Sequence, residues 1–267
     1  MPSPAPGDHP FDISKPNTAR VYDYWLGGKD NFAADRELAE RLEKITPAVR
    51  AMAVRNREFL GRAVPWCARE LDISQYLDLG SGLPAAENIH ESARLVIPGA
   101  TVAYVDCDGV AVSHGQALLA GSGGVAAVLG DLRDPEGVLG DPAVRSVIDI
   151  GRPAAAIFAL VLHFMKASEA QTAVAGYVKE LAPGSAVIIS CGRNDDPVLW
   201  GRVRGAYVAG DVYNHTREEI LGFFAGLEMV PPGLVPARAW RGGMPDSGLG
   251  PDSAAYALCG VAVKTRP

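Results

Sequence analysis

Residues 76–85 read YLDLGSGLPA, a short apolar run that leads through an acidic residue into a glycine-rich turn. The run predicts a buried strand, and the stretch at 84–97 that follows it has helical periodicity. The start of a helix presents free N–H groups, and Gly80 and Gly82 carry no Cβ that would keep a ligand from the backbone. The stretch therefore predicts a ligand site at the end of the first strand of an α/β sheet.

The same alternation of strand and helix continues along the chain. Further strand-like runs lie at 101–106, 125–131, 152–164 and 185–190. Strands joined by helical crossovers form a mostly parallel sheet that is covered on both faces. The last strand-like stretches, 227–240 and 254–264, are joined by a Gly/Pro-rich loop at 242–251 and predict an antiparallel hairpin at one sheet edge.

The chain before the first strand is helical in pattern. Apolar residues recur at spacings of three and four over 18–71, with a break at the Gly27–Gly28 pair. The first ten residues hold four prolines, which is typical of a disordered tail. We expect a tail over 1–10, a helical cap or lid over 11–72 and an α/β domain over 73–267.

The composition limits the class of protein. The chain has 267 residues and a formal net charge of −6, which excludes a strongly basic protein that coats nucleic acid. No apolar run approaches the roughly 20 residues that span a membrane, and the start lacks a signal-peptide pattern. The four cysteines are far apart, so neither a zinc site nor a disulfide framework is expected. We expect a cytoplasmic protein without a metal or a membrane partner.

An acidic residue stands before the glycine turn. Asp78 lies two residues before Gly80, where its carboxylate would repel a pyrophosphate but attract an ammonium group. This order favours a cofactor that carries an amino acid. The G-x-G-x-x-A spacing from Gly80 to Ala85, together with Asp106 after the second strand, also satisfies a loose dinucleotide fingerprint. An NAD(P)-dependent oxidoreductase therefore stays open as the alternative.

Three motifs together resemble the cofactor motifs of class I S-adenosylmethionine-dependent methyltransferases. They are LDLGSG at 77–82, YVDCD at 104–108 and LGDLRDP at 129–135. With the segment at 17–42 they are similar to an actinobacterial S-adenosyl methyltransferase family formerly catalogued as a domain of unknown function, from about residue 11 to the C-terminus. The resemblance implies a Rossmann-like methyltransferase sheet, S-adenosyl-L-methionine as cofactor and in-line transfer of a methyl group.

The resemblance also gives each acidic residue a partner. Asp78 would meet the methionyl ammonium, Asp106 the two ribose hydroxyls and Asp131 the adenine amino group, with the Leu132 N–H offered to a ring nitrogen. Ser81 stands in the glycine loop where the family usually has a threonine. The expected cofactor-binding residues are Asp78, Gly80, Ser81, Gly82, Asp106, Asp131, Leu132, Tyr22, Gly28 and Asn88.

The segment at 20–31 combines aromatic and polar side chains around a glycine pair. We expect it to fold over the carboxyl edge of the sheet as a lid, with Gly28 in the turn and a Tyr or Trp face against the sulfonium. The alternative is an ordinary helix that packs Val21, Tyr24 and Trp25 into the core.

His163 follows the fourth strand, where enzymes of this kind present side chains to the reacting methyl group. An ordinary imidazole pKa of about 6.5 suits a general base for an acceptor hydroxyl or amine. The alternative is a histidine that only orders its loop. Asn88, just after the glycine loop, either points into the same cleft or caps the following helix.

The acceptor is expected to be a small molecule whose identity and reacting atom the sequence does not reveal, and the oligomeric state is equally open. A non-catalytic regulatory protein that binds S-adenosylmethionine is a further alternative. The acidic net charge disfavours a nucleic-acid acceptor. Five arginines between residues 50 and 69 nevertheless prevent its exclusion. A solvated helix face is the ordinary interpretation of such arginines.

Overall fold

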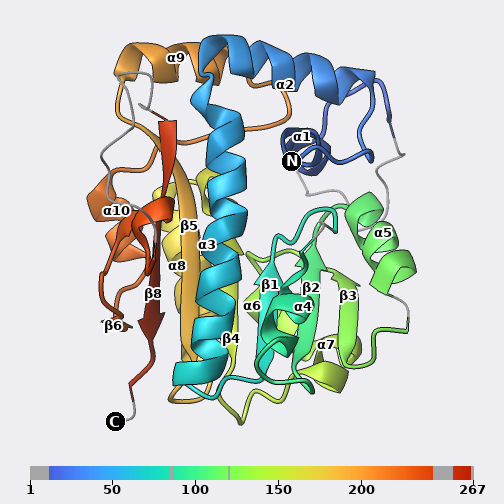
Figure 1. The fold of residues 1–267 in the computed structure, drawn as a ribbon, viewed down its shortest axis with the longest axis vertical. Coiled ribbons are helices and arrows are strands. Elements are labelled where there is room, and N and C mark those ends of the chain that lie inside the picture. Colours follow the sequence, from blue (N-terminus) through green and yellow to red (C-terminus); the bar gives the residue numbers. More distant parts are fainter. Residues whose placement is uncertain (1–11, 85–86, 120, 243–254, 266–267) are drawn as a thin grey trace.

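A parallel sheet forms the centre of the molecule (Figure 1). Its parallel strands follow the order β3-β2-β1-β4-β5. Every residue of β1 is buried, as expected of a central strand that is covered on both faces. The strands are β1 (Gln75–Leu79), β2 (Thr101–Asp106), β3 (Val125–Leu129), β4 (Ala155–Ala159) and β5 (Ala186–Asn194).

The computed structural model describes most of the chain. The described ranges are 12–84, 87–119, 121–242 and 255–265. The tail predicted over 1–10 lies outside these ranges, and so does most of the predicted loop at 242–251.

An antiparallel edge completes the sheet. β8 (Ala255–Val263) runs opposite to β5, and the short strands β6 (Glu228–Met229) and β7 (Val235–Pro236) pair with β8. The first strand expected for this hairpin is split in two, because the Pro231–Pro232 pair between β6 and β7 has no N–H group to give to a ladder. The predicted fold class, a mostly parallel α/β sheet with an antiparallel C-terminal edge, is confirmed.

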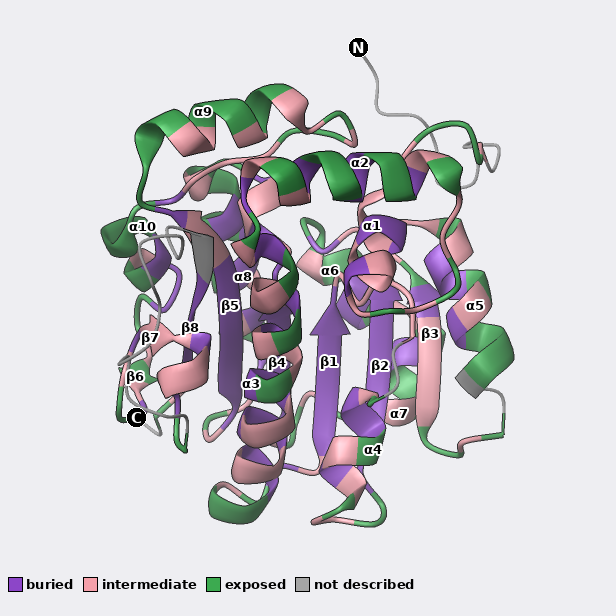
Figure 2. Cartoon of the chain, turned by 45° about the horizontal axis from the view of Figure 1, so that its top comes forward, coloured by how far each residue is buried: buried purple, intermediate pink, exposed green. Residues whose placement is uncertain are grey.

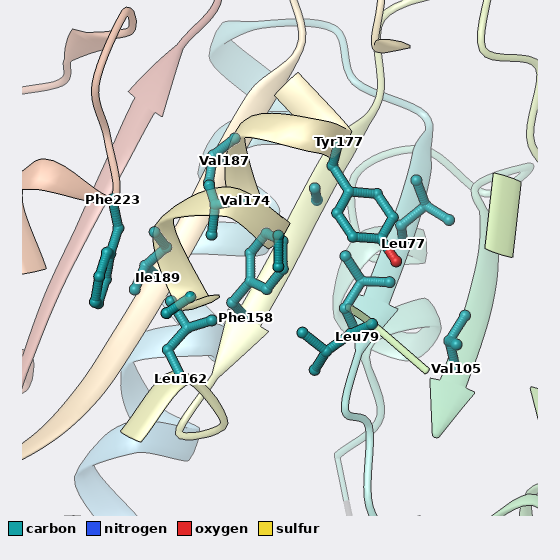
Figure 3. Packing of buried hydrophobic residues seen from close by; sticks show 14 of the residues in the cluster. Leu77, Leu79, Val105, Phe158, Leu162, Val174, Tyr177, Val187, Ile189 and Phe223 are labelled. Carbon is teal, nitrogen blue, oxygen red and sulfur yellow. The ribbon is translucent and has the colours of Figure 1, made fainter. Parts of the chain in front are cut away.

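Short helices and α8 cover one face of the sheet. Their apolar side chains form a core cluster with Leu77 and Leu79 of β1. Figure 3 shows Tyr177 of α8 beside Leu77, and its ring meets that of Phe158 edge to face at 5.7 Å. The helices on this face are α6 (Pro135–Gly140), α7 (Pro142–Val147), α8 (Ala167–Glu180) and α10 (Arg217–Gly222).

The opposite face is covered by α3 (Ala48–Glu70) and α4 (Ile89–Arg94), while α5 (Gly109–Leu119) packs beside β3. Phe59 of α3 is fully buried in the core of this face. The helical region predicted over 11–72 therefore contributes to the sheet layers as well as to a cap. Within the described ranges, no helix is both long and apolar enough to cross a membrane.

Three helices lie across the carboxyl edge of the sheet, and β1 points toward the first of them (Figure 2). They are α1 (Thr18–Trp25), α2 (Ala33–Ile45) and α9 (Pro197–Ala206), which we call the cap. Val21 and Trp25 of α1 are buried in a small core that α2 and α9 share. The cap thus has apolar packing of its own, apart from the two cores of the sheet.

A buried ion pair joins α1 to α2. Arg20 Nε donates to the Asp35 carboxylate at 2.7 Å, and the two side chains are 5% and 0% exposed. The same carboxylate accepts the backbone N–H groups of Asn17 and Phe32, each at 2.8 Å. Asp35 therefore fixes the start of both helices, since three separate donors converge on it.

We expect Asp35→Asn to lower the free energy of unfolding by about 3 kcal/mol or more, because the change removes the carboxylate charge that pairs with the buried Arg20 guanidinium. Urea denaturation followed by circular dichroism measures the loss. Glu37→Gln, at an exposed position of the same helix, is the matched control and should leave the midpoint in place. Equal midpoints for the two variants would show that the pair does not hold the cap.

Candidate functional site

A cavity of about 540 Å³ separates the cap from the carboxyl edge of the sheet. Its floor is made by the glycine turn and by the loops after β2, β3, β4 and β5, and its roof by α1, α2, the start of α3 and α9. Protein sites for small ligands usually enclose about 300–1,000 Å³. This central cavity is therefore large enough for a cofactor together with part of a small acceptor.

The glycine turn needs its glycines for packing as well as for access. Gly80 and Gly82 have φ of +75° and +64°, in the region that side chains rarely adopt. A Cβ on Gly80 would lie 2.5 Å from Val161 Cγ2, in the loop after β4. A Cβ on Gly82 would lie 3.7 Å from Ala19 Cβ of α1. The turn is thus closely covered from the β4 side, and α1 lies directly over it.

Asp106 clamps this turn to the end of β2. Its carboxylate accepts the N–H of Gly82 at 2.7 Å and that of Asp108 at 2.9 Å. Burial raises the pKa of Asp106, and these backbone hydrogen bonds oppose the rise. Because a carboxylate has about four acceptor positions, both oxygens keep capacity for the hydroxyls of a ligand.

Asp78 is a buried carboxylate without a donor. Its residue is 6% exposed at the cavity wall, and no described residue gives it a hydrogen bond. Burial raises the pKa of Asp78 to about 7, with the Asp106 charge adding to the rise and the Arg57 charge opposing it. A buried charge of this kind is costly unless a cation reaches it. The site therefore suits a positively charged ligand group, as the sequence predicts.

Arg57 of α3 lies on the same wall as Asp78, which the interpretation as a solvated helix face did not foresee. Its position could have been read from the helix period, because Arg57 follows the buried Ala53 by four residues and precedes the buried Leu60 by three. A guanidinium near a carboxylate provides one place for each charge of an amino-acid zwitterion.

Asp131 reaches the cavity with a partner already bound. Arg133 donates to its carboxylate from the backbone at 2.9 Å and from the side chain at 2.5–2.9 Å. Partial burial alone would raise the pKa of Asp131, but these hydrogen bonds outweigh it and lower the pKa. Leu132 is buried on the cavity floor next to Gly80. An adenine amino group would thus have to share Asp131 with Arg133.

A buried hydrogen-bond chain ties the cap to the sheet. Ser190 Oγ of β5 donates to Asn56 Oδ1 at 2.6 Å, and Asn56 Nδ2 donates to the Tyr22 hydroxyl at 2.9 Å. Tyr22 in turn donates to the carbonyl oxygen of Ala53 at 3.2 Å. Tyr22 lines the cavity, as expected, but its hydroxyl is engaged within the protein.

Two predicted residues lie away from the central cavity. Gly28 packs over Asp23, whose carboxylate fills the space where a Cβ would stand, and its N–H donates to the Asp23 carbonyl. Gly28 is therefore a structural turn rather than part of the cavity wall. Asn88 caps α4 through Glu91 and borders a smaller recess beside the glycine turn, which Ser81 also lines.

His163 stands on the cavity wall within a turn of 3₁₀ helix at Leu162–Phe164. Burial, with a contribution from His215, lowers the pKa of His163 to about 3. Its Nδ1 is buried and has no hydrogen-bond partner among the described residues. The imidazole is therefore neutral at pH 7. The expected role as a general base rested on an ordinary pKa near 6.5, and His163 does not have that pKa.

The helix α9 was not foreseen, although it supplies part of the roof. The Asp196–Pro197 pair could have indicated it, because Asp196 caps the helix and proline suits the first helical position. Trp200 and Val203 reach the cavity from α9, and Tyr207 follows it. The Tyr207 hydroxyl is 2.7 Å from Thr18 Oγ1, which links this side of the roof to α1.

Comparisons with known proteins agree on one family. A family model described as S-adenosyl methyltransferase matches residues 5–265. A proposed methyltransferase from Thermobifida fusca YX is 40% identical over 96% of this chain and 97% of that chain, with a TM-score of 0.90. A DUF574 family protein from Streptomyces avermitilis MA-4680 is 34% identical over 95% of this chain and 100% of its own, with a TM-score of 0.86.

More distant structures share the fold alone. The N-methyltransferase NodS from Bradyrhizobium japonicum WM9 is 14% identical over 79% of this chain and 97% of its own, with a TM-score of 0.51. Among curated proteins, none matches the chain.

Asp78→Asn should stabilise the ligand-free protein. The pKa of about 7 lies above the ordinary 3.8, so ionisation of Asp78 destabilises the folded state. This destabilisation is absent below about pH 4 and reaches its full size above about pH 7. At roughly 1.4 kcal/mol for each pH unit between the two values, the variant gains up to about 4 kcal/mol at pH 8. Urea denaturation at pH 4 and pH 8 checks this, and a variant that is no more stable at pH 8 contradicts it.

Proposed function

Because this chain belongs to the S-adenosyl methyltransferase family, we propose how its central cavity is divided between the cofactor and an acceptor. The enzyme is an S-adenosylmethionine-dependent methyltransferase. The observation that carries the proposal is the buried Asp78 carboxylate, which stands beside the glycine turn and receives no hydrogen bond from any described residue. These residues fit a methionyl ammonium, whereas they would repel the pyrophosphate of a nicotinamide cofactor.

The cofactor would occupy the part of the cavity above β1, β2 and β3. Asp78 would hold the ammonium group and Arg57 the carboxylate of the methionyl part, with Asp106 on the ribose hydroxyls. The buried Leu132 would contact the adenine ring, and Asp131 its amino group beside Arg133. The support for this arrangement is that these side chains border one cavity in chain order along the carboxyl edge of the sheet.

The reaction itself asks the protein mainly for alignment. When held by these residues, the cofactor would supply an activated methyl group for transfer to a lone pair of the acceptor, with the electron pair of the broken bond left on sulfur. Holding the reacting atoms in line can remove roughly 7 to 11 kcal/mol from such a barrier. The cap contributes by covering the carboxyl edge, since α1 lies directly over the glycine turn.

His163 would act by hydrogen bonding rather than by storing a proton. With a pKa lowered to about 3, the neutral imidazole can accept a hydrogen bond from an acceptor hydroxyl or amine, but it holds a full proton poorly at pH 7. A proton lost by the acceptor would therefore pass on to solvent. A small-molecule acceptor and a cytoplasmic location remain predictions from the sequence.

Binding of S-adenosylhomocysteine tests the cofactor site. By titration calorimetry at pH 8 we expect Asp106→Ala and Arg57→Met each to weaken binding about 10- to 100-fold, the usual effect of losing a hydrogen bond to a charged group. Arg69→Met, in the exposed last turn of the same helix as Arg57, is the matched control. If Asp106→Ala and Arg57→Met bind as tightly as the control, the site assignment is wrong.

The pH dependence of that binding reports on Asp78. Only the ionised carboxylate attracts the ammonium group, so the affinity should fall by up to about tenfold for each pH unit below about 7 and level off above it. Asp78→Asn should bind weakly and lose this dependence. A wild-type affinity that is constant between pH 5.5 and 8 would contradict the role of Asp78.

A further inference from the structure

We infer that the acceptor is a neutral, largely apolar aromatic molecule with one or two polar atoms. The inference rests on the proposed function, because it concerns the part of the central cavity that the cofactor would leave open. That part, the acceptor chamber, lies between the cap and the loops after β4 and β5. Its walls include Trp25, Met52, Phe164, Val203, Tyr207 and Tyr213.

The chamber is a continuous space above the end of β5. Gly192 of β5 forms its floor, and a Cβ placed there would lie 3.6 Å from Met52 Sδ and 3.7 Å from the His163 ring. The His163 and Phe164 rings are 4.2 Å apart, and the Phe164 ring stacks on Tyr207 at 5.9 Å and 24°. Aromatic surfaces from the sheet and from the cap thus meet in one place, which favours a flat aromatic ligand.

Charge is divided unequally between the two parts of the cavity. Among the described lining residues, every carboxylate lies at the carboxyl end of β1 or β2 or in the loops after β2 and β3: Asp78, Asp106, Asp108 and Asp131. The described part of the acceptor chamber has no carboxylate for a cationic acceptor. Its arginine, Arg193, is engaged by Asp195 at 2.6 Å and by the His215 carbonyl at 2.7 Å.

A charged acceptor would therefore lose its hydration without finding a free counter-charge. Burial of an ion without a partner is strongly unfavourable, while burial of apolar surface is favourable. The chamber selects against anions and cations for this reason, and the apolar walls give a neutral ring system the larger gain.

The His163 ring lines the chamber and can orient such a ligand. Its Nδ1 is buried and has no hydrogen-bond partner within the described chain. Because His163 is neutral, it can exchange a hydrogen bond with a hydroxyl or an amine without requiring charge. The acceptor is thus expected to carry one such group, whose lone pair takes the methyl group and whose proton leaves to solvent.

Three naphthalene probes of similar size test the charge preference: 2-naphthol, 2-naphthoate and 2-naphthylmethylammonium. Their affinities are measured by calorimetry at pH 7, on the protein saturated with S-adenosylhomocysteine and again on the free protein. We expect 2-naphthol to bind at least tenfold more tightly than either ion. Equal or tighter binding of an ion, or no binding of 2-naphthol, would overturn the inference.

Substitutions in α9 test the place of binding. Val203→Glu puts a charge on the chamber wall and should weaken 2-naphthol binding at least tenfold, while Val203→Phe narrows the chamber without a charge and serves if the first variant does not fold. Val198→Glu, on the same helix at a residue that is 73% exposed, is the matched control and should bind within twofold of wild type. Unchanged 2-naphthol affinity in both Val203 variants would overturn the inference.

The two proposals fail in different ways. If the inference alone is wrong, wild type and all three valine variants still bind S-adenosylhomocysteine with the same affinity, and only the naphthalene results depart from expectation. If the cofactor site is wrong, either wild type does not bind S-adenosylhomocysteine or the Asp106→Ala and Arg57→Met variants bind it as tightly as the Arg69→Met control. The probe series on the free protein still decides the nature of the chamber.

Discussion

The burial of the Asp78 carboxylate, to which no described residue donates a hydrogen bond, is the constraint around which the site is arranged. Folding removes this group from water, and the described residues offer it the charge of Arg57 alone, so the ligand-free protein retains an unfavourable interaction that a cationic ligand group would relieve. The glycine turn does not satisfy Asp78, because the Gly82 N–H donates to Asp106. Ionised Asp78 lowers the stability of the folded protein, and we propose that it selects an ammonium group in return.

The cap matters to the site because it is anchored from several sides. The Asp35 hub orders the start of α1 and α2, the Asn56 chain ties Tyr22 to the sheet, and the Thr18–Tyr207 contact joins α1 to the segment after α9. These polar contacts help to hold the cap over the cavity, since the apolar core of the cap is small compared with the two cores of the sheet. The chamber beyond the cofactor is therefore shaped by contacts between segments that lie far apart in the chain.

Much of the site could be predicted because it follows strands. Asp78, Asp106 and Asp131 each stand at the end of a strand whose apolar run is easy to recognise, and parallel strands bring their ends to one edge. Arg57 was missed because the other arginines of α3 suggest a solvated helix face. Only the packing of α3 against the sheet shows which of them reaches the cavity. Gly28 was placed at the cavity because a glycine pair indicates a turn without indicating what the turn covers, which here is Asp23.

By itself the sequence determined the α/β class, the carboxyl-edge site and the family, because periodicity and local motifs depend only on residues close together in the chain. Only the tertiary structure decided the pKa of His163, the partner of Asp131 and the apolar character of the acceptor chamber. Each of these depends on burial and on which side chains from distant parts of the sequence come into contact. Local sequence patterns do not indicate such contacts.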